Sequence, residues 1–383
     1  MALLDLAARW GQARGRPILA LGVDHRLHPD SARWTAFAAR AARAAGVDWR
    51  PLAWTGDKPA TGLPAAARAA RHRLIADAAR AAGARVVLFA HTADDAAETD
   101  WMRAGGAAIG RLRPWSPSPA WPEGRGLMLL RPLLDIDRAA LRALLRARGL
   151  DWLEDPANAD PRFARARARA ALADGAPPPP PETVAAPPDC EGLQADWTGA
   201  VRLPRGAPGA VLAAALLGAA GGHVPPRGAR LAALRARLAR GGPVRATLAG
   251  ARVVAGPDGA RLSREPGRTG LPDLALRADA PMVWDGRFEL VAPGPGWRVA
   301  PVAGRAAALE AADRRLLGTL PAEVRPGLPV LIRDSAPRPV LAWRAAPVRA
   351  LAPGRLAAAL GRVAREADLD VPPDGETPPS ALF

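Results

Sequence analysis

The chain has 383 residues, more than one hydrophobic core usually organises, and 49% of them are hydrophobic, enough for two or three cores. The formal net charge is +16, and no apolar run approaches the roughly 20 residues of a membrane span, so we expect no membrane contact. The single cysteine, Cys190, excludes an intramolecular disulfide and a Cys-x-x-Cys metal or redox pair. With no secretory signal at Met1, the sequence predicts a multidomain cytoplasmic protein.

The positive charge supports two interpretations. Lys58 is the only lysine among the 53 basic residues, and tyrosine is absent while alanine, arginine, glycine and proline abound, a skew that coding bias produces. The same charge attracts polyanions, because phosphates that bind cationic side chains release their counterions. RNA is compatible with this charge, although charge alone does not identify it.

Helix and strand patterns alternate through the first part of the chain. Leu3, Leu6 and Trp10 share one face of the first predicted helix, and a buried strand follows it. Asp30 is expected to cap the next helix, which Gly46 ends. Such alternation predicts an α/β fold with a parallel sheet flanked by helices. The predicted helices are 1–14, 30–45, 64–82, one entered near residue 93, and 137–148, and the predicted strands are 17–23, 85–90 and 127–130.

A proline-rich segment divides the chain. Prolines at 177–181 and 187–188 favour an extended spacer, so we expect a domain at 1–172, a linker at 173–191, a middle domain at 192–267 and a C-terminal domain at 268–383. The middle domain contains a candidate basic helix at 227–240, with leucines on its inner face, and a hairpin turn at Pro257-Asp258-Gly259. Short strands are predicted within 284–302 and 328–343. The two later domains are smaller and of the α+β type.

Polar side chains follow two of the buried strands. Asp24 and His25 come directly after the first strand, although Asp24 could equally cap a turn. The strand that ends near residue 90 runs into the densest cluster in the chain. Ligands bind at the carboxyl ends of strands in such sheets, and residues four apart share a helix face. We therefore expect three carboxylates and an imidazole to meet there: His91, Asp94, Asp95 and Glu98.

Such a cluster suits a magnesium ion that bridges phosphate oxygens, because magnesium prefers oxygen ligands. It could also hold an ammonium group. The alternative is that Asp94 and Asp95 only stabilise the positive N-terminal end of a helix.

Arginines form the third feature. Arg162, Arg165 and Arg169 are spaced to share one helix face, where guanidinium groups could grip phosphates. Arg68 and Arg71 could add positive charge at the same edge of the sheet. A solvated helix face is the alternative for the first three.

In their order and spacing, four segments resemble the tRNA(Ile)-lysidine synthetase family, which belongs to the PP-loop ATP pyrophosphatase group. The similarity continues more weakly past the linker and covers nearly the whole length. The four segments are 23–31, 58–63 with the run to Arg71, His91 to Thr99, and 155–169.

The resemblance implies an adenine nucleotide alpha hydrolase-like fold and a carbon–nitrogen ligase that uses ATP and Mg²⁺. ATP would adenylate the wobble cytidine of a tRNA(Ile) with a CAU anticodon, and L-lysine would then displace AMP to give lysidine. It further implies that the later domains bind tRNA. The implied catalytic residues are His91, Asp94, Asp95, Glu98, Arg165 and Arg169, with Asp95 and Glu98 as metal ligands and Asp24, His25, Arg68 and Arg71 at the nucleotide.

The sequence departs from the family at several points. The family's Ser-Gly-Gly-x-Asp-Ser loop, which cradles pyrophosphate, does not occur, and 1–10 resembles the helix that follows it. We therefore expect that Met1 is an internal methionine and that the chain as written binds ATP poorly and is inactive. His72 stands where the family has tyrosine, Ala166 where it has asparagine, and 103–106 only approximates a glycine-rich stretch.

Other functions remain open. One is a catalytically inactive tRNA-binding remnant of the family. Another is a different PP-loop tRNA-modifying enzyme, such as a thiolase, but those enzymes use paired cysteines and this chain has only Cys190. A basic RNA-binding protein without nucleotide chemistry is the third, and the ordered acidic segment disfavours it.

Overall fold

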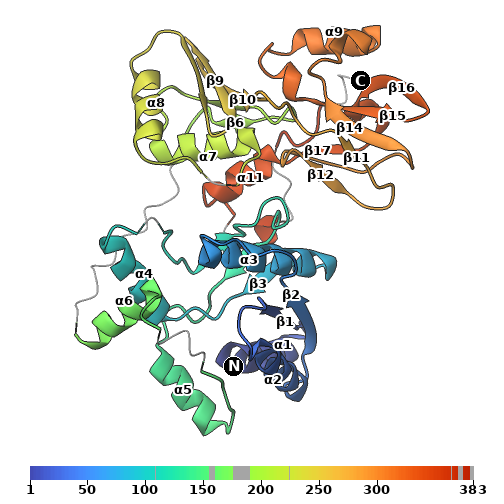
Figure 1. Cartoon of the computed structure of the whole chain (residues 1–383). Coiled ribbons are helices and arrows are strands. Elements are labelled where there is room, and N and C mark those ends of the chain that lie inside the picture. Colours follow the sequence, from blue (N-terminus) through green and yellow to red (C-terminus); the bar gives the residue numbers. More distant parts are fainter. Residues whose placement is uncertain are drawn as a thin grey trace. The chain divides into compact units, whose positions relative to one another are not determined.

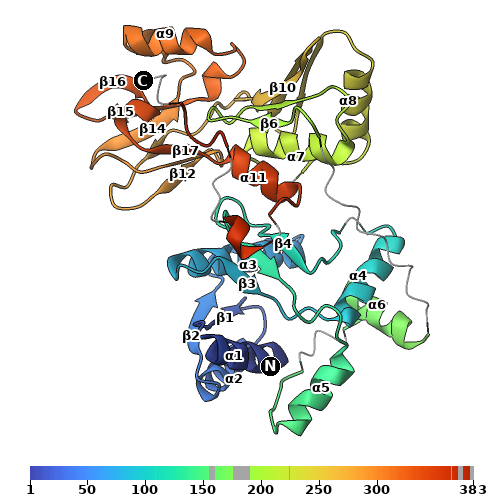
Figure 2. The ribbon, with the colours of Figure 1, turned by 180° about the vertical axis from the view of Figure 1, so that it is seen from behind.

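The computed structural model of the chain describes residues 1–107, 109–154, 160–175, 190–223, 225–363, 365–369 and 374–379. The chain divides into two compact units, Met1–Val184 and Ala185–Phe383, called here the N-terminal and C-terminal units (Figures 1 and 2). Most of the predicted linker at 173–191 lies outside the described residues. The predicted boundary at 267/268 stays a prediction.

The N-terminal unit alternates helices and strands, and the predicted α/β fold is confirmed. Strands β1 and β2 pair in parallel, β3 and β5 pair in parallel, and β4 adds an antiparallel edge. Every predicted helix and strand of the unit is present, whereas β2 and β4 were not predicted. The elements are α1 (Ala2–Arg14), β1 (Leu19–Asp24), α2 (Ser31–Ala44), β2 (Asp48–Ala53), α3 (Leu63–Ala81), β3 (Val86–Leu88), α4 (Ala93–Ala104), β4 (Trp115–Pro117), β5 (Met128–Leu130), α5 (Arg138–Ala147) and α6 (Ala164–Ala173).

Local sequence explains how the first strand pair packs. Gly22 of β1 lies under Trp49 of β2, and a Cβ atom at position 22 would come within 2.1 Å of the indole ring. Any side chain at position 22 would therefore force the Trp49 ring to move. Helices α2 and α3 pack on this strand pair. Asp30 occupies the predicted N-cap position of α2, but its side chain makes no capping hydrogen bond. Its backbone N–H instead donates to His28 Nδ1 at 3.1 Å.

The C-terminal unit begins with an antiparallel sheet of order β6-β7-β10-β9-β8, which packs against α7 and α8. The predicted basic helix is confirmed as α8, with Leu234 and Leu238 buried, and the predicted hairpin is formed by β9 and β10. The elements are β6 (Gln194–Ala195), β7 (Val201–Leu203), α7 (Gly209–Ala220), α8 (Ala229–Ala239), β8 (Val244–Leu248), β9 (Ala251–Gly256) and β10 (Gly259–Arg264).

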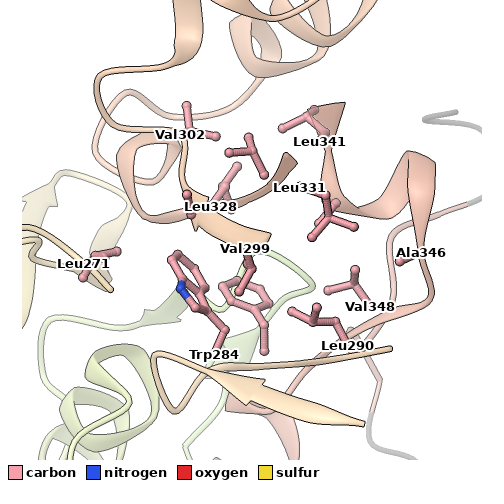
Figure 3. Close-up of a cluster of buried hydrophobic side chains, with 14 of the residues drawn as sticks. Leu271, Trp284, Leu290, Val299, Val302, Leu328, Leu331, Leu341, Ala346 and Val348 are labelled. Atoms are coloured by element: carbon pink, nitrogen blue, oxygen red, sulfur yellow. The ribbon is translucent and has the colours of Figure 1, made fainter. Parts of the chain in front are cut away.

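Two further sheets, β11-β14-β15-β16 and β12-β13-β17, enclose a second core around Trp284, Phe288 and Leu331 (Figure 3). Helix α11 returns to pack on α7. No helix in the described part of the chain is both long and apolar enough to cross a membrane. The elements are β11 (Leu274–Ala275), β12 (Met282–Trp284), β13 (Phe288–Leu290), β14 (Trp297–Pro301), η2 (Ala306–Ala308), α9 (Ala311–Thr319), η3 (Arg325–Gly327), β15 (Pro329–Arg333), β16 (Ala336–Leu341), α10 (Ala342–Ala345), β17 (Val348–Ala350), α11 (Ala352–Ala359) and η4 (Glu366–Leu369).

Candidate active site

The carboxyl ends of the parallel strands carry the candidate site residues. Asp24 ends β1 and is followed by His25, and His91 follows β3 by three residues. Arg131 comes directly after β5, which pairs in parallel with β3. These ends are where a sheet of this kind binds ligands.

Helix α4 begins in a way that orients Asp95. Thr92 is its N-cap: the Asp95 backbone N–H donates to Thr92 Oγ1 at 3.4 Å, and the Thr92 N–H donates to Asp95 Oδ2 at 2.9 Å. This capping box satisfies two backbone donors that the helix itself cannot pair. Asp95 therefore stabilises the N-terminal end of α4, as one of the two alternatives predicted. Its other oxygen, Oδ1, remains available for contacts outside the helix.

The acidic cluster, defined as Asp94, Asp95 and Glu98, converges on one arginine. The backbone N–H of Arg138 donates to Asp94 Oδ2 at 2.8 Å, and its Nη2 donates to Asp95 Oδ1 and Glu98 Oε1, both at 3.0 Å. Arg169 Nε also donates to Glu98 Oε1, at 2.8 Å, although the Glu98 side chain is only 1% exposed. Glu98 Oε2 is buried without a hydrogen-bond partner among the described residues.

Four arginines interact electrostatically with one another and form the arginine cluster, defined as Arg68, Arg71, Arg131 and Arg165; one of them reaches the acids. Arg165 Nη1 lies 3.8 Å from Asp95 Oδ1. Burial, followed by the charge of neighbouring arginines, lowers the pKa of Arg68, Arg71 and Arg131. Within the described chain, the Nε atoms of Arg71 and Arg131 are buried without a partner. Unpaired buried donors that repel one another are stabilised by an anion, so this cluster suits phosphate.

Neutral aromatic groups line the same region. Phe89 stacks on His91 with ring centroids 5.8 Å apart and packs against His72 at 5.3 Å. Burial and then the charge of Arg68 lower the pKa of His72 to about 3, and burial and then the charge of Arg131 lower that of His91 to about 4. Both imidazoles are therefore neutral near pH 7. Their buried His72 Nε2 and His91 Nδ1 atoms have no partner among the described residues, so both can hydrogen-bond a ligand.

The end of β1 is coupled to the arginine cluster. Burial, then the charge of Arg71, lowers the pKa of His25, whose ring lies edge-on to Trp54 at 6.2 Å. Lys58 lies over Trp54, with its Nζ 3.7 Å from the ring centroid. Asp24 Oδ1 accepts a hydrogen bond from the backbone N–H of Arg26 at 2.7 Å. This contact agrees with the alternative that Asp24 caps a turn.

The structure brings together most, but not all, of the residues that the sequence analysis expected to meet. Arg165 and Arg169 meet the acidic cluster, whereas Arg162 precedes α6 and pairs with Asp160 on the surface, so its predicted place on the same face is wrong. The first five residues of the segment 155–169 lie outside the described residues.

Two arginines were missed. Arg131 follows a buried strand, which is the same signal that singled out Asp24 and His91. Arg138 stands in the first turn of α5, where the helix dipole disfavours a cation. That unfavourable position was the signal that could have revealed it.

The acidic cluster is also the candidate donor set for a metal ion. Among the described residues, no three His, Cys, Asp or Glu side chains are grouped so as to hold a metal ion. Each member of the acidic cluster is instead within 4.0 Å of an arginine nitrogen, and the arginine cluster adds more positive charge. The donor set therefore fits an anion rather than a bare cation, and the assignment of Asp95 and Glu98 as magnesium ligands stays a prediction.

The fold and the site define a class of protein, an α/β domain with a candidate anion site at the carboxyl ends of its parallel strands. Residues 1–175 match the family model of the PP-loop domain. A tRNA(Ile)-lysidine synthase from Caulobacter vibrioides is 47% identical over 376 residues, which cover 95% of this chain and 91% of that protein. Another, from Methylobacterium nodulans, is 37% identical over 66% of this chain and 84% of its own length. The chain belongs to the tRNA(Ile)-lysidine synthase family.

One solved structure shows a faint likeness. It is the U34-tRNA thiolase NcsA from Methanococcus maripaludis with its [4Fe-4S] cluster, at 13% identity and a TM-score of 0.37, over 45% of this chain and 62% of that one. A likeness of this size says nothing about the site.

Proposed function

We propose that this chain is a carbon–nitrogen ligase that joins L-lysine to the wobble cytidine of a tRNA(Ile) with a CAU anticodon, using ATP. The cytidine is adenylated with release of pyrophosphate, and lysine then displaces AMP to give lysidine. The observation that carries the proposal is the juxtaposition of buried, unpaired arginine donors with an acidic cluster that keeps one carboxylate oxygen free. A cytoplasmic location, where ATP, lysine and tRNA occur together, is part of it.

The arginine cluster supports the first step. Attack of a cytidine oxygen on the α-phosphorus of ATP expels pyrophosphate, so negative charge must be held on the departing phosphates. The unpaired Nε–H groups of Arg71 and Arg131 are suitable donors, because guanidinium–phosphate hydrogen bonds are stronger than neutral ones. Mg²⁺ enters this proposal only as the counterion of ATP. His25 and Asp24 then lie beside the nucleotide.

The acidic cluster supports the second step. The lysine amine forms a carbon–nitrogen bond with the adenylated cytidine, the carbon–oxygen bond to AMP breaks, and the amine loses a proton. Glu98 Oε2 is a buried acceptor without a partner among the described residues, so it can hold that amine and take its proton. Arg165 and Arg169, beside Asp95 and Glu98, stabilise the departing AMP.

The C-terminal unit contributes the tRNA contacts in this proposal. Its helix α8 buries leucines on one face and exposes arginines on the other. Such a face binds the phosphate backbone without reading its sequence. The arginines are Arg230, Arg235, Arg237 and Arg240.

The test is a ligation assay on the purified protein. The enzyme is incubated with a tRNA(Ile) transcript that has a CAU anticodon, radioactive lysine and Mg-ATP. We expect one lysine incorporated per tRNA, with AMP and pyrophosphate released in equal amounts. A transcript with uridine at the wobble position is the matched control and should incorporate none.

Two variants assign the steps. Glu98→Gln should lose lysine incorporation by about 100-fold or more, because a group that accepts a proton typically contributes at least that much. Arg71→Gln should instead raise the KM for ATP. If the wild-type protein releases AMP without incorporating lysine, or incorporates equally into both transcripts, the proposal is wrong.

A further inference from the structure

Arg138 is held at the acidic cluster by the backbone as well as by its side chain. Ala93, the first residue of α4, donates its N–H to the carbonyl of Ile136 at 2.9 Å. Two residues later, the Arg138 N–H donates to Asp94 Oδ2 at 2.8 Å. The starts of α4 and α5 are therefore tied together, and the guanidinium group is delivered from a fixed base rather than from a mobile loop.

The two arginines at Glu98 bind the same oxygen. Arg138 Nη2 and Arg169 Nε both donate to Oε1, at 3.0 and 2.8 Å, and neither contacts Oε2. A carboxylate with both donors on one oxygen has a fixed rotation, and its second oxygen points away from them. Oε2 is buried and has no partner in the described part of the chain, so the clamp leaves this oxygen as the acceptor of the pair that is not used within the protein.

Helix α5 does not need Arg138 to begin. Asp137 already caps it, with its Oδ1 accepting the Ala140 N–H at 2.6 Å. A cation in the first turn opposes the helix dipole, an effect of about 0.3–1 kcal/mol. The position is therefore explained by the carboxylates that Arg138 contacts and not by the stability of its own helix.

We propose that Arg138 is a positioning residue for the transfer of lysine: it clamps Glu98 and Asp95 so that Glu98 Oε2 faces the incoming amine. This inference rests on the proposed function. Arg138 acts through Glu98 and contacts neither the cytidine nor ATP. Its loss therefore affects the second step of the reaction much more than the first.

The experiment separates the two steps in Arg138→Gln. Adenylation is followed by the exchange of radioactive pyrophosphate into ATP in the presence of tRNA and the absence of lysine. Transfer is followed in a single turnover after lysine is added. We expect nearly unchanged exchange, a higher KM for lysine and about 100-fold slower transfer, because a displacement of about 1 Å at a reacting group has an effect of that size.

Two further variants provide the controls. Arg142→Gln removes an arginine from the next turn of the same helix, where its partner Glu154 is on the surface, and it should leave both steps unchanged. Arg138→Lys keeps the charge but replaces the two coplanar N–H groups of Nη2, which donate to Asp95 and Glu98, with a rotating ammonium group on a different stem. Its transfer rate should therefore lie between those of the wild type and Arg138→Gln.

The outcomes are distinguishable. If the wild-type protein ligates lysine but Arg138→Gln slows exchange and transfer equally, Arg138 is a structural residue and the inference is wrong. The same conclusion follows if Arg138→Lys is no better than Arg138→Gln. If the wild-type protein itself incorporates no lysine, the proposed function fails rather than the role of Arg138.

Discussion

Buried arginines occur in both units, but they are satisfied in different ways. In the C-terminal unit, Arg287 is 2% exposed, its Nε donates to Asp285 at 2.8 Å, and its Nη2 donates to the carbonyl of Gly327. Arg355 there donates to the carbonyl of Leu217 at 3.1 Å and to that of Gly222. In the N-terminal unit, Arg71 and Arg131 each leave a buried Nε without a partner among the described residues.

The difference distinguishes arginines that stabilise the fold from arginines whose donors are available to a ligand. A buried arginine that donates to carbonyls or a carboxylate of other segments holds those segments together, and its loss leaves those polar groups unpaired. A buried arginine with unpaired donors is incomplete until a ligand arrives, and desolvation makes it an unfavourable feature of the free protein. Each class predicts a different response to the same substitution.

The largest effect is expected at Arg287. Arg287→Met leaves the Gly327 carbonyl unpaired and weakens the neutralisation of Asp285, which then depends on Arg264. We expect a loss of about 3 kcal/mol in the free energy of unfolding, at the low end for breaking a buried pair because Arg264 remains. Thermal denaturation followed by circular dichroism measures it. A melting temperature equal to that of the wild type would contradict the structural role.

The opposite result is expected at Arg71. Arg71→Met removes a desolvated cation that has other arginines as neighbours, so unfolding should be unchanged or slightly harder. Binding of ATP should weaken by about 10- to 100-fold, since one hydrogen bond to a charged group contributes about 1.5–3 kcal/mol. Calorimetric titration with Mg-ATP and thermal denaturation of the same sample test both statements. If Arg71→Met unfolds as easily as Arg287→Met, the comparison between the units fails.

The buried His72 makes the stability of the N-terminal unit depend on pH, which gives a further test. Its pKa in the folded protein is about 3, below the ordinary value of 6.5, so the unfolded chain binds a proton more readily. The free energy of unfolding is therefore not reduced by His72 above pH 6.5, and it decreases as the pH falls from 6.5 towards 3. The expected slope is about 1.4 kcal/mol per pH unit for this histidine.

His72→Phe removes the titrating group from the same packed position beside Phe89. We expect it to reduce the loss of stability between pH 6.5 and 5, as measured by denaturant unfolding at several pH values. Equal slopes in His72→Phe and the wild type would show that His72 is not buried neutral.

The sequence predicted the alternating fold and the acidic cluster because both depend on local signals. Buried strands are apolar runs, and polar groups at their ends stand out, as at Asp24 and His91. Strand β2 was missed because Asp48, Arg50 and Pro51 break its apolar pattern, and it is a strand only because β1 pairs with it.

The site residues that the sequence did not predict correctly are positioned by tertiary contacts. Arg138 lies 40 residues from Glu98 in the sequence, and no periodicity relates the two. Arg162 was misplaced because charge spacing was followed past the start of α6, where Asp160 draws its side chain to the surface. Spacing predicts which residues share a helix face, but only where the helix exists.

The smallest effect is expected at Thr92, where structure and function meet in one side chain. Thr92→Ala removes the N-cap of α4, which should lower the free energy of unfolding by about 1 kcal/mol. It also removes one of the two Thr92 donors to Asp95 Oδ2, so this carboxylate is then held by the Thr92 backbone N–H and by Arg138. Thr92→Ser keeps the hydroxyl and should restore both properties. If Thr92→Ala loses stability but transfers lysine at the wild-type rate, the Thr92 hydroxyl is not needed to orient Asp95. Its role in the capping box is then purely structural, like that of the paired arginines in the C-terminal unit.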